Sequence, residues 1–202
     1  MKKENSKQKV KQTRVARICW NTNSWESPSG MPGKSLNKKT FENINGYGHE
    51  EWLFEKGREI NGYHYGKIEA ISQHNKDKFK NYIFDLYLFS INSITKERFW
   101  VGKIKNVEVI SDFECNKIYE EYIKRDWKSF MKKQLENFKT SALDRFDSFD
   151  PVDISNFFTI KFKEEDVEVY DLKTHRFSKN DTAIPGARYR VLYNFKGIPK
   201  FI

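Results

Sequence analysis

Tryptophan residues in a polar loop are the clearest chemical feature of this 202-residue chain. Trp20 and Trp25 flank Asn21 and Asn23, at the start of a segment (21–39) that is rich in Asn, Ser, Gly and Pro. Indole rings can stack on a nucleobase, and asparagine side chains can hydrogen-bond to its edge. Such stacking contributes about 1–3 kcal/mol per base. The pattern predicts a pocket for an extruded base.

Three further aromatic residues, Tyr47, Trp52 and Tyr65, follow in a glycine-rich region and complete the predicted base pocket. The alternative is that Trp20 and Trp52 are core residues at the ends of strands. Trp25 lies deeper in loop sequence and is the better pocket candidate.

Basic residues beside this region could hold the phosphates of a nucleic acid. The predicted phosphate-binding residues are Arg14, Arg17, Lys34, Lys38 and Lys39. Six of the nine net positive charges lie within residues 1–17, and neutralisation of phosphates by Lys and Arg gives non-specific affinity for nucleic acids. A solubilising tail and solvated loop lysines are the alternatives.

Motifs of catalysis are missing or incomplete. Gly30 to Ser35 resembles the end of a phosphate-binding loop, but Pro28 stands where the first glycine is needed. The chain has no Glu-x-Lys motif, and its four histidines lack the spacing of metal ligands. We therefore expect no catalytic residue, no cofactor and no metal. The alternative is a metal-dependent nuclease whose acidic groups are dispersed in the sequence, for example Asp85, Glu97, Asp166 and Glu168.

The apolar pattern predicts an α+β domain with a curved sheet and one long amphipathic helix. Residues 1–13 have no apolar periodicity and are expected to form a disordered basic tail, with residues 14–202 forming a single domain. The helix should span Asp112 to Lys139, with Ser111 as its N-cap. Gly102 should mark a bulge or turn. Strands are predicted at 14–20, 51–54, 63–72, 81–91, 97–101, 103–110, 157–162, 167–170 and 188–195.

Targeting and membrane signals are not visible in the sequence. No apolar run approaches the roughly 20 residues that span a bilayer, and the first residues lack the apolar segment of a signal peptide. Cys19 and Cys115 are too few for a disulfide scaffold or a cysteine-rich zinc site. We expect a cytoplasmic protein with reduced cysteines and no membrane partner.

Four segments resemble a known group of bacterial domains: Cys19 to Trp25, Pro28 to Gly30, Gly46 to Phe54, and Phe99 to Ile104. The chain is similar, over about residues 14–195, to PUA-like domains close to the EVE and SRA-type readers of modified bases. Such domains occur in defence proteins with HNH-nuclease or Mcr-type (type IV restriction) GTPase or ATPase partners. The resemblance implies a curved β-barrel and flipping of a modified cytosine, or another base, into an aromatic pocket.

These observations favour a non-enzymatic DNA-binding specificity module that recognises a modified base in a restriction or antiviral defence system. Its partners would be modified duplex DNA and a nuclease or NTPase motor subunit, which would supply the cleavage. The nuclease named above and an RNA-binding PUA-like module are the alternatives, since the same pocket chemistry serves RNA. A protein-interaction adaptor is a fourth.

Overall fold

The computed structural model describes residues 10–72, 75–138, 140–147, 154, 156–181, 184, 186–195 and 197–201. Its strands are β1 (Val10–Arg17), β2 (His64–Gly66), β3 (Tyr82–Ile91), β4 (Arg98–Val109), β5 (Ile160–Phe162), β6 (Val167–Val169) and β7 (Tyr193–Asn194). Its helices are α1 (Phe41–Asn45), α2 (Lys76–Phe79), α3 (Asp112–Lys124), α4 (Trp127–Lys133) and α5 (Thr140–Asp147), with 3₁₀ turns η1 (His49–Trp52) and η2 (Glu164–Asp166). The predicted α+β class is confirmed.

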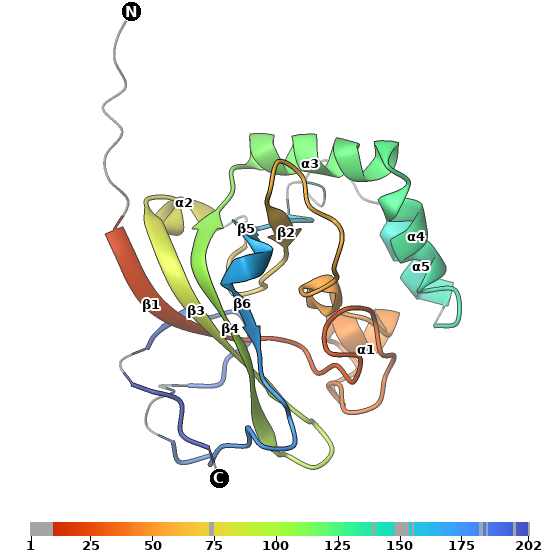
Figure 1. Cartoon of the computed structure of the whole chain (residues 1–202). Coiled ribbons are helices and arrows are strands. Elements are labelled where there is room, and N and C mark those ends of the chain that lie inside the picture. Colours follow the sequence, from red (N-terminus) through yellow and green to blue (C-terminus); the bar gives the residue numbers. More distant parts are fainter. Residues whose placement is uncertain are drawn as a thin grey trace, which may run out of the picture.

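The seven strands form one mixed sheet in the order β2-β5-β4-β3-β1-β7, with β6 paired to the outer edge of β4. Only the β1–β3 pair is parallel among these strands. The order is open, so the described strands do not close into a barrel. Figure 1 shows β3 and β4 as long, bent strands at the centre of the molecule.

The predicted strands 97–101 and 103–110 form one continuous strand, β4, that runs through Gly102. The register with β3 shifts beside Gly102, as expected for a bulge. A Cβ atom at Gly102 would lie 2.5 Å from the backbone oxygen of Glu168, so the missing side chain allows β6 to approach.

Strand β1 begins at Val10, which corrects the prediction of a disordered tail over 1–13 and of a strand over 14–20. Val10 to Arg17 pair in parallel with Tyr82 to Phe89, so the polar residues 11–13 join the sheet through tertiary pairing. Their polarity suits this position because β7 pairs only with Arg14 and Val15 along the outer edge of β1. Residues 1–9 of the predicted tail lie outside the described residues.

The predicted single helix over 112–139 is divided, which is a second correction. Helix α3 begins with the expected cap, since the Ser111 hydroxyl accepts a hydrogen bond from the Glu114 amide at 3.1 Å. It ends before Asp126, which adopts a left-handed conformation with φ 60°. The new helix direction packs Trp127 edge-on against Tyr122, with 5.0 Å between the ring centroids. Lys139 lies outside the described residues.

Several predicted strands are shorter or absent, and the expected strands 157–162 and 167–170 are reduced to 160–162 and 167–169. The segment 51–54 contributes to η1 and a turn, because the Glu51 carboxylate accepts a hydrogen bond from the Gly48 amide and closes a 3₁₀ turn. Only 64–66 of the expected strand 63–72 and only 193–194 of the expected strand 188–195 are extended in the sheet.

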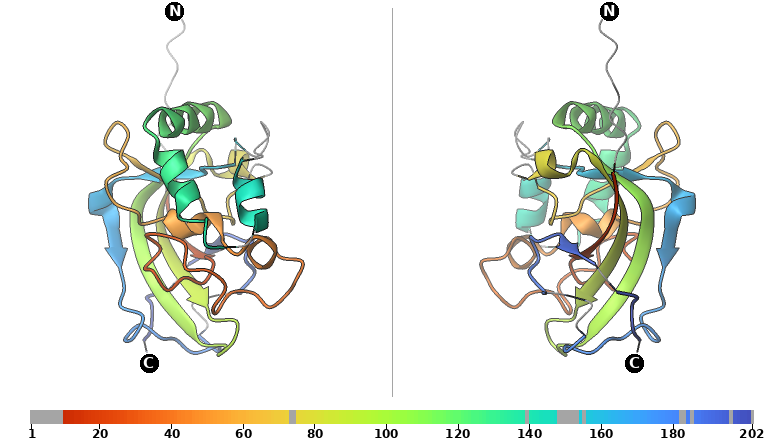
Figure 2. Two further views of the ribbon diagram at one scale, coloured as in Figure 1. Left: turned by 90° about the vertical axis from the view of Figure 1, so that its right-hand side faces the viewer. Right: turned by 90° about the vertical axis from the view of Figure 1, so that its left-hand side faces the viewer.

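Three apolar clusters hold the layers together. One lies between the sheet and the segments that contain Trp25 and Ile68, and a second joins α3, α4 and α5 to the η1 region. The third joins Trp100 and Phe89 of the sheet to the C-terminal segment around Phe177. Helices α3 to α5 lie on the side of the molecule away from β1 (Figures 1 and 2). No helix in the described ranges is both long enough and apolar enough to cross a bilayer.

Candidate functional site: a cationic cleft

The tryptophan loop does not form a base pocket. Trp25 is 1% exposed and packs in the core cluster beneath the sheet. Its indole nitrogen donates a hydrogen bond to the Cys19 carbonyl at 2.9 Å. Trp20 is half-buried, and its ring fills the space beside Gly33 and lies 5.4 Å from Phe99. Neither indole lines the two cavities described below, which corrects the predicted role of both.

The two asparagines of this loop hold the loop itself. The buried Asn21 amide donates to the Glu51 carboxylate at 2.7 Å and to the Ser27 carbonyl at 2.8 Å. The Asn23 amide donates to the Pro28 carbonyl at 2.9 Å. Both side chains are thus occupied by local contacts, and neither lines a cavity described here. The buried Asn21 is thereby unavailable to a base edge, whereas the base contact of the exposed Asn23 stays a prediction.

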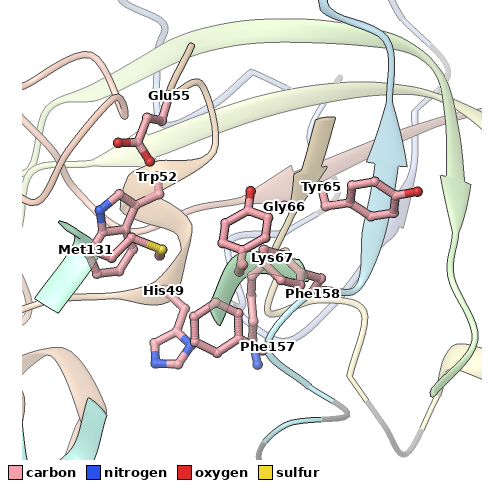
Figure 3. A pocket seen from close by; sticks show the side chains of 10 residues that line it. His49, Trp52, Glu55, Tyr65, Gly66, Lys67, Met131, Phe157 and Phe158 are labelled. Carbon is pink, nitrogen blue, oxygen red and sulfur yellow. The ribbon is translucent and has the colours of Figure 1, made fainter. Parts of the chain in front are cut away.

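Tyr47, Trp52 and Tyr65 belong to the helical core cluster. Trp52 and Tyr65 also line a small inner pocket together with His49, Lys67 and residues of the core (Figure 3). This inner pocket has a volume of about 20 Å³, which is enough for about one water molecule. It cannot hold a nucleobase, so these three rings are structural in the described conformation.

A much larger cavity lies next to the inner pocket and shares His49 and Lys67 with it. We call this cavity, of about 820 Å³, the cationic cleft. Its volume is within the range of small-molecule and cofactor sites, about 300–1,000 Å³. Its walls are Arg17, Ser35, Lys39, Thr40, Phe41, Glu42, Gly48, His49, Glu50, Lys67, Glu69, Ser72, Arg145, Asn156, Ala187, Arg188, Tyr189 and Arg190.

Distant parts of the sequence build the cationic cleft. The end of β1, the loop before α1, η1, the segment after β2, helix α5 and the segment 187–190 each contribute to its walls. Of the five predicted phosphate-binding residues, Arg17 and Lys39 are placed here. Lys38 is exposed but does not line the cleft. Figure 2 shows the loop beside α1 projecting from the body of the protein.

Lys34 and Arg14, by contrast, do not face the cleft. The Lys34 side chain is fully buried, pairs with Glu51 at 2.8 Å and donates to the Gly30 carbonyl. Arg14 bonds to Gln12 and lies over Phe79 and Phe84, each ring centroid being 5.9 Å from the guanidinium carbon. The buried ion pair leaves Lys34 unavailable to a phosphate, whereas the phosphate contact of the half-buried Arg14 stays a prediction outside the cleft.

The cleft has an excess of positive charge. Six of its wall residues are Lys or Arg and three are Glu. Glu69 forms ion pairs with Arg190 at 3.1 Å and with Lys67 at 3.6 Å. Among the described residues, Arg17, Lys39 and Arg188 have no carboxylate within ion-pair distance. Three cations are thus available for an anionic ligand.

The carboxyl groups in the cleft carry less negative charge than their number suggests. Burial raises the pKa of Glu50 to about 7, despite hydrogen bonds from the amides of Glu69 and Cys19, each at 2.8 Å, and from the Tyr189 hydroxyl. Burial also raises the pKa of Glu42. At neutral pH Glu50 is therefore partly protonated, which increases the positive potential of the cleft.

Aromatic surface accompanies this charge. The cleft is lined by Phe41, which is 37% exposed, and by the half-buried rings of His49 and Tyr189. Burial, and to a smaller extent the charges of Lys67 and Arg145, lower the pKa of His49 well below its usual value. His49 is therefore neutral at pH 7 and stacks on Tyr47, with 5.4 Å between ring centroids.

Sequence reasoning missed most of this site. Glu50, His49 and Phe41 lie in or near the segment Gly46 to Phe54, whose tryptophan and tyrosine residues carry the stronger sequence signal. The segment Arg188-Tyr189-Arg190 carries two arginines around a tyrosine, which is a signal for nucleic-acid contact that could have been noticed. Its place beside Glu50, 139 residues earlier, follows only from the fold.

The dispersed acidic residues of the nuclease alternative do not form a metal site. Asp85 pairs with Lys11, Glu97 pairs with Arg176, and Asp166 accepts a hydrogen bond from Asn106. Within the part of the chain that the structure describes, no group of three or more His, Cys, Asp or Glu side chains could hold a metal ion.

Comparisons with known proteins give no further guide to the site. No family model, curated protein or solved structure matches the chain. The site must therefore be interpreted from its own geometry and charge.

Proposed function

We propose that the chain is a DNA-binding specificity module that accepts an extruded, modified base in the cationic cleft. The observation that carries this proposal is the combination of three cations without carboxylate partners, Arg17, Lys39 and Arg188, with the aromatic surfaces of Phe41 and Tyr189 in one cavity. Cations attract the phosphate backbone, and aromatic rings stack on bases. The tryptophan loop is held to η1 through the Asn21–Glu51 hydrogen bond and does not contact the base.

The resemblance of the Cys19–Trp25 and Gly46–Phe54 segments to PUA-like readers supports the modified base and the defence role. Under this proposal the open sheet is a PUA-like core. A nuclease or motor subunit would carry out cleavage. Extrusion of a base costs a few kcal/mol, which stacking and phosphate contacts in the cleft would offset.

The first test is a binding titration of the full chain with three duplexes that differ at one cytosine: plain, methylated or hydroxymethylated. We expect one modified duplex to bind more tightly than the plain one. Equal affinities for all three duplexes would refute the recognition of a modified base. Competition with RNA of the same sequence tests the RNA-binding alternative, which predicts that RNA displaces the duplex.

The second test uses single substitutions in the cleft. Arg188→Ala removes an exposed cation, so binding should weaken for all duplexes and the salt dependence should fall by about one phosphate contact. Lys105→Ala is the control, since Lys105 is exposed on β4 and does not line the cleft. If both variants behave alike, the cleft is not the binding site.

Phe41→Ala tests stacking separately from charge. Loss of a stacking ring should cost about 1–3 kcal/mol in binding of the preferred duplex. The control is Phe113→Ala, because Phe113 is 69% exposed on α3 and lies outside the cleft. Unchanged affinity of the Phe41 variant would place the base elsewhere.

A further inference from the structure

Arg17 has an unusual hydrogen-bonding state for a residue in the wall of a cavity. It is the last residue of β1 and lines the cationic cleft. One terminal nitrogen, Nη1, donates to the Ala187 carbonyl at 3.3 Å. Its Nε–H group is buried and has no hydrogen-bond partner among the described residues. An unsatisfied buried donor destabilises the protein, and this cost is recovered when a ligand accepts the hydrogen bond.

A second arginine, Arg98, lies near Arg17. Arg17 pairs with Phe89 of β3, and Arg98 pairs with Ile91 two residues further along that strand. Paired residues and residues two apart on a strand share a face of the sheet, so both arginines lie on one face. Burial and the nearby charge of Arg17 lower the pKa of Arg98.

No carboxylate neutralises this arginine pair. Neither Arg17 nor Arg98 forms an ion pair within 4 Å with any residue that the structure describes. The facing acidic residue on the α1 side is Glu42, whose pKa is raised by burial and lowered by the charge of Arg17. The ring of Tyr189 lies on another side, 5.9 Å from the Arg17 guanidinium carbon. Two like charges that are partly buried without a counter-ion indicate a place for an external anion.

We propose that Arg17, backed by Arg98, binds a phosphate group that enters the cationic cleft. This inference rests on the proposed function, in which the phosphate belongs to the nucleotide whose base is extruded. The guanidinium group presents its donors in a planar fork that matches phosphate oxygens. Arg17 uses one of its five donors on Ala187, which leaves the other Nη hydrogens for phosphate oxygens, and the buried Nε–H joins them once the guanidinium turns toward the cleft. The nearby charge of Arg98 increases the positive potential at the Arg17 guanidinium group.

The experiment is a titration of the ¹⁵N-labelled full chain with inorganic phosphate, observed through the arginine Nε–H signals. We expect one Nε–H signal to shift with saturation, and the same signal to be absent from the spectrum of Arg17→Lys. The lysine variant keeps the charge and loses the fork, so its Kd for phosphate should rise at least about tenfold. Arg125→Lys is the control, since Arg125 pairs with Glu121 on α3 outside the cleft and should leave the affinity unchanged. A saturable shift that persists in Arg17→Lys would overturn the proposal.

A thermal melt of each variant shows whether it is folded. If Arg17→Lys does not fold, phosphate titrations of the wild-type chain and of Arg98→Gln still test whether the arginine site binds phosphate. Arg98→Gln should weaken phosphate binding by roughly threefold through loss of potential, without loss of the shifted signal. No saturable shift in the wild-type chain would refute the site.

The outcome for this site is separable from that of the proposed function. If a modified duplex binds but phosphate shifts no arginine signal, the arginine site is wrong and the DNA-reading function stands. If phosphate binds through Arg17 but every duplex fails to bind, the anion site stands and DNA reading fails. Titrations with deoxycytidine monophosphate and with deoxycytidine distinguish a nucleotide phosphate from free phosphate. If the site takes the phosphate of a nucleotide, deoxycytidine monophosphate should bind more tightly than inorganic phosphate, and deoxycytidine, which has no phosphate, should not.

Discussion

The ammonium nitrogen of Lys34 lies 2.8 Å from Oε1 of Glu51, and both side chains are fully buried. The same carboxylate accepts hydrogen bonds from the Gly48 amide, the Ser29 amide and the Asn21 side chain. Glu51 therefore connects the tryptophan loop to the start of η1. Because Gly48 also lines the cationic cleft, this ion pair supports one wall of the proposed site.

Removing one partner of this ion pair should strongly destabilise the fold. Lys34→Met leaves the Glu51 carboxylate buried without its cation, which typically costs about 3–5 kcal/mol. Urea denaturation measures the loss in the free energy of unfolding. The double variant Lys34→Met/Glu51→Gln should lose less than the sum of the two single variants. Lys38→Ala is the control, since an exposed loop lysine should change stability by no more than about 0.5 kcal/mol.

Substitution of Trp25 should affect folding before it affects binding. Trp25 is buried in the core cluster, so Trp25→Ala should lower the free energy of unfolding by about 3–5 kcal/mol. Trp25→Phe should retain most of the packing and bind DNA like the wild type, because the indole does not reach the cleft. If Trp25→Phe is stable but binds DNA ten times more weakly, the expectation is wrong and the indole takes part in binding.

The raised pKa of Glu50 predicts a pH dependence of stability. Its pKa is about 7 in the folded protein and about 4.5 when unperturbed. Between about pH 4.5 and pH 7 the Glu50 carboxyl group is therefore protonated in the folded state and ionised in the unfolded state. The stabilisation is present below about pH 4.5 and is lost as the pH rises through 7, by up to about 3 kcal/mol. Glu50→Gln has no ionisable group at this position, so it lacks this pH dependence. The stability of the wild type relative to Glu50→Gln should therefore be greater at pH 5 than at pH 8.

Denaturation of both proteins at the two pH values provides the measurement. The comparison removes the contribution of Glu55, whose pKa is also raised to about 7 and which both proteins contain. A difference between the two proteins that does not change with pH would show that Glu50 titrates normally.

Gly33 should not tolerate a side chain. Its φ is +79°, and a Cβ atom would lie 2.3 Å from the Trp20 ring. Gly33→Ala should destabilise the protein by about 2 kcal/mol or more from backbone strain and displacement of the indole. Near-ultraviolet circular dichroism should report the moved Trp20. Gly57→Ala is the control, because Gly57 has a similar φ of +77° and no atom lies within 4 Å of the added Cβ. This variant therefore measures the backbone strain alone. Equal losses of stability in the two variants would show that contact with the Trp20 ring contributes nothing.

The sequence by itself determined the elements with a strong local pattern. The apolar runs of β3 and β4 and the Ser111 cap of α3 are where the pattern predicts them, because side-chain periodicity and capping act over a few residues. The α+β class follows from the same local signals.

The tertiary structure decided which polar and aromatic residues are available for function. Trp25 and Lys34 resemble ligand-binding residues in sequence, yet the fold buries both, one beneath the sheet and the other against Glu51. Tyr189 and Glu50 are 139 residues apart and meet only when the C-terminal segment returns to the end of β1. Burial and ion pairing are long-range properties, set by which segments pack together, so the composition of a loop could not reveal them.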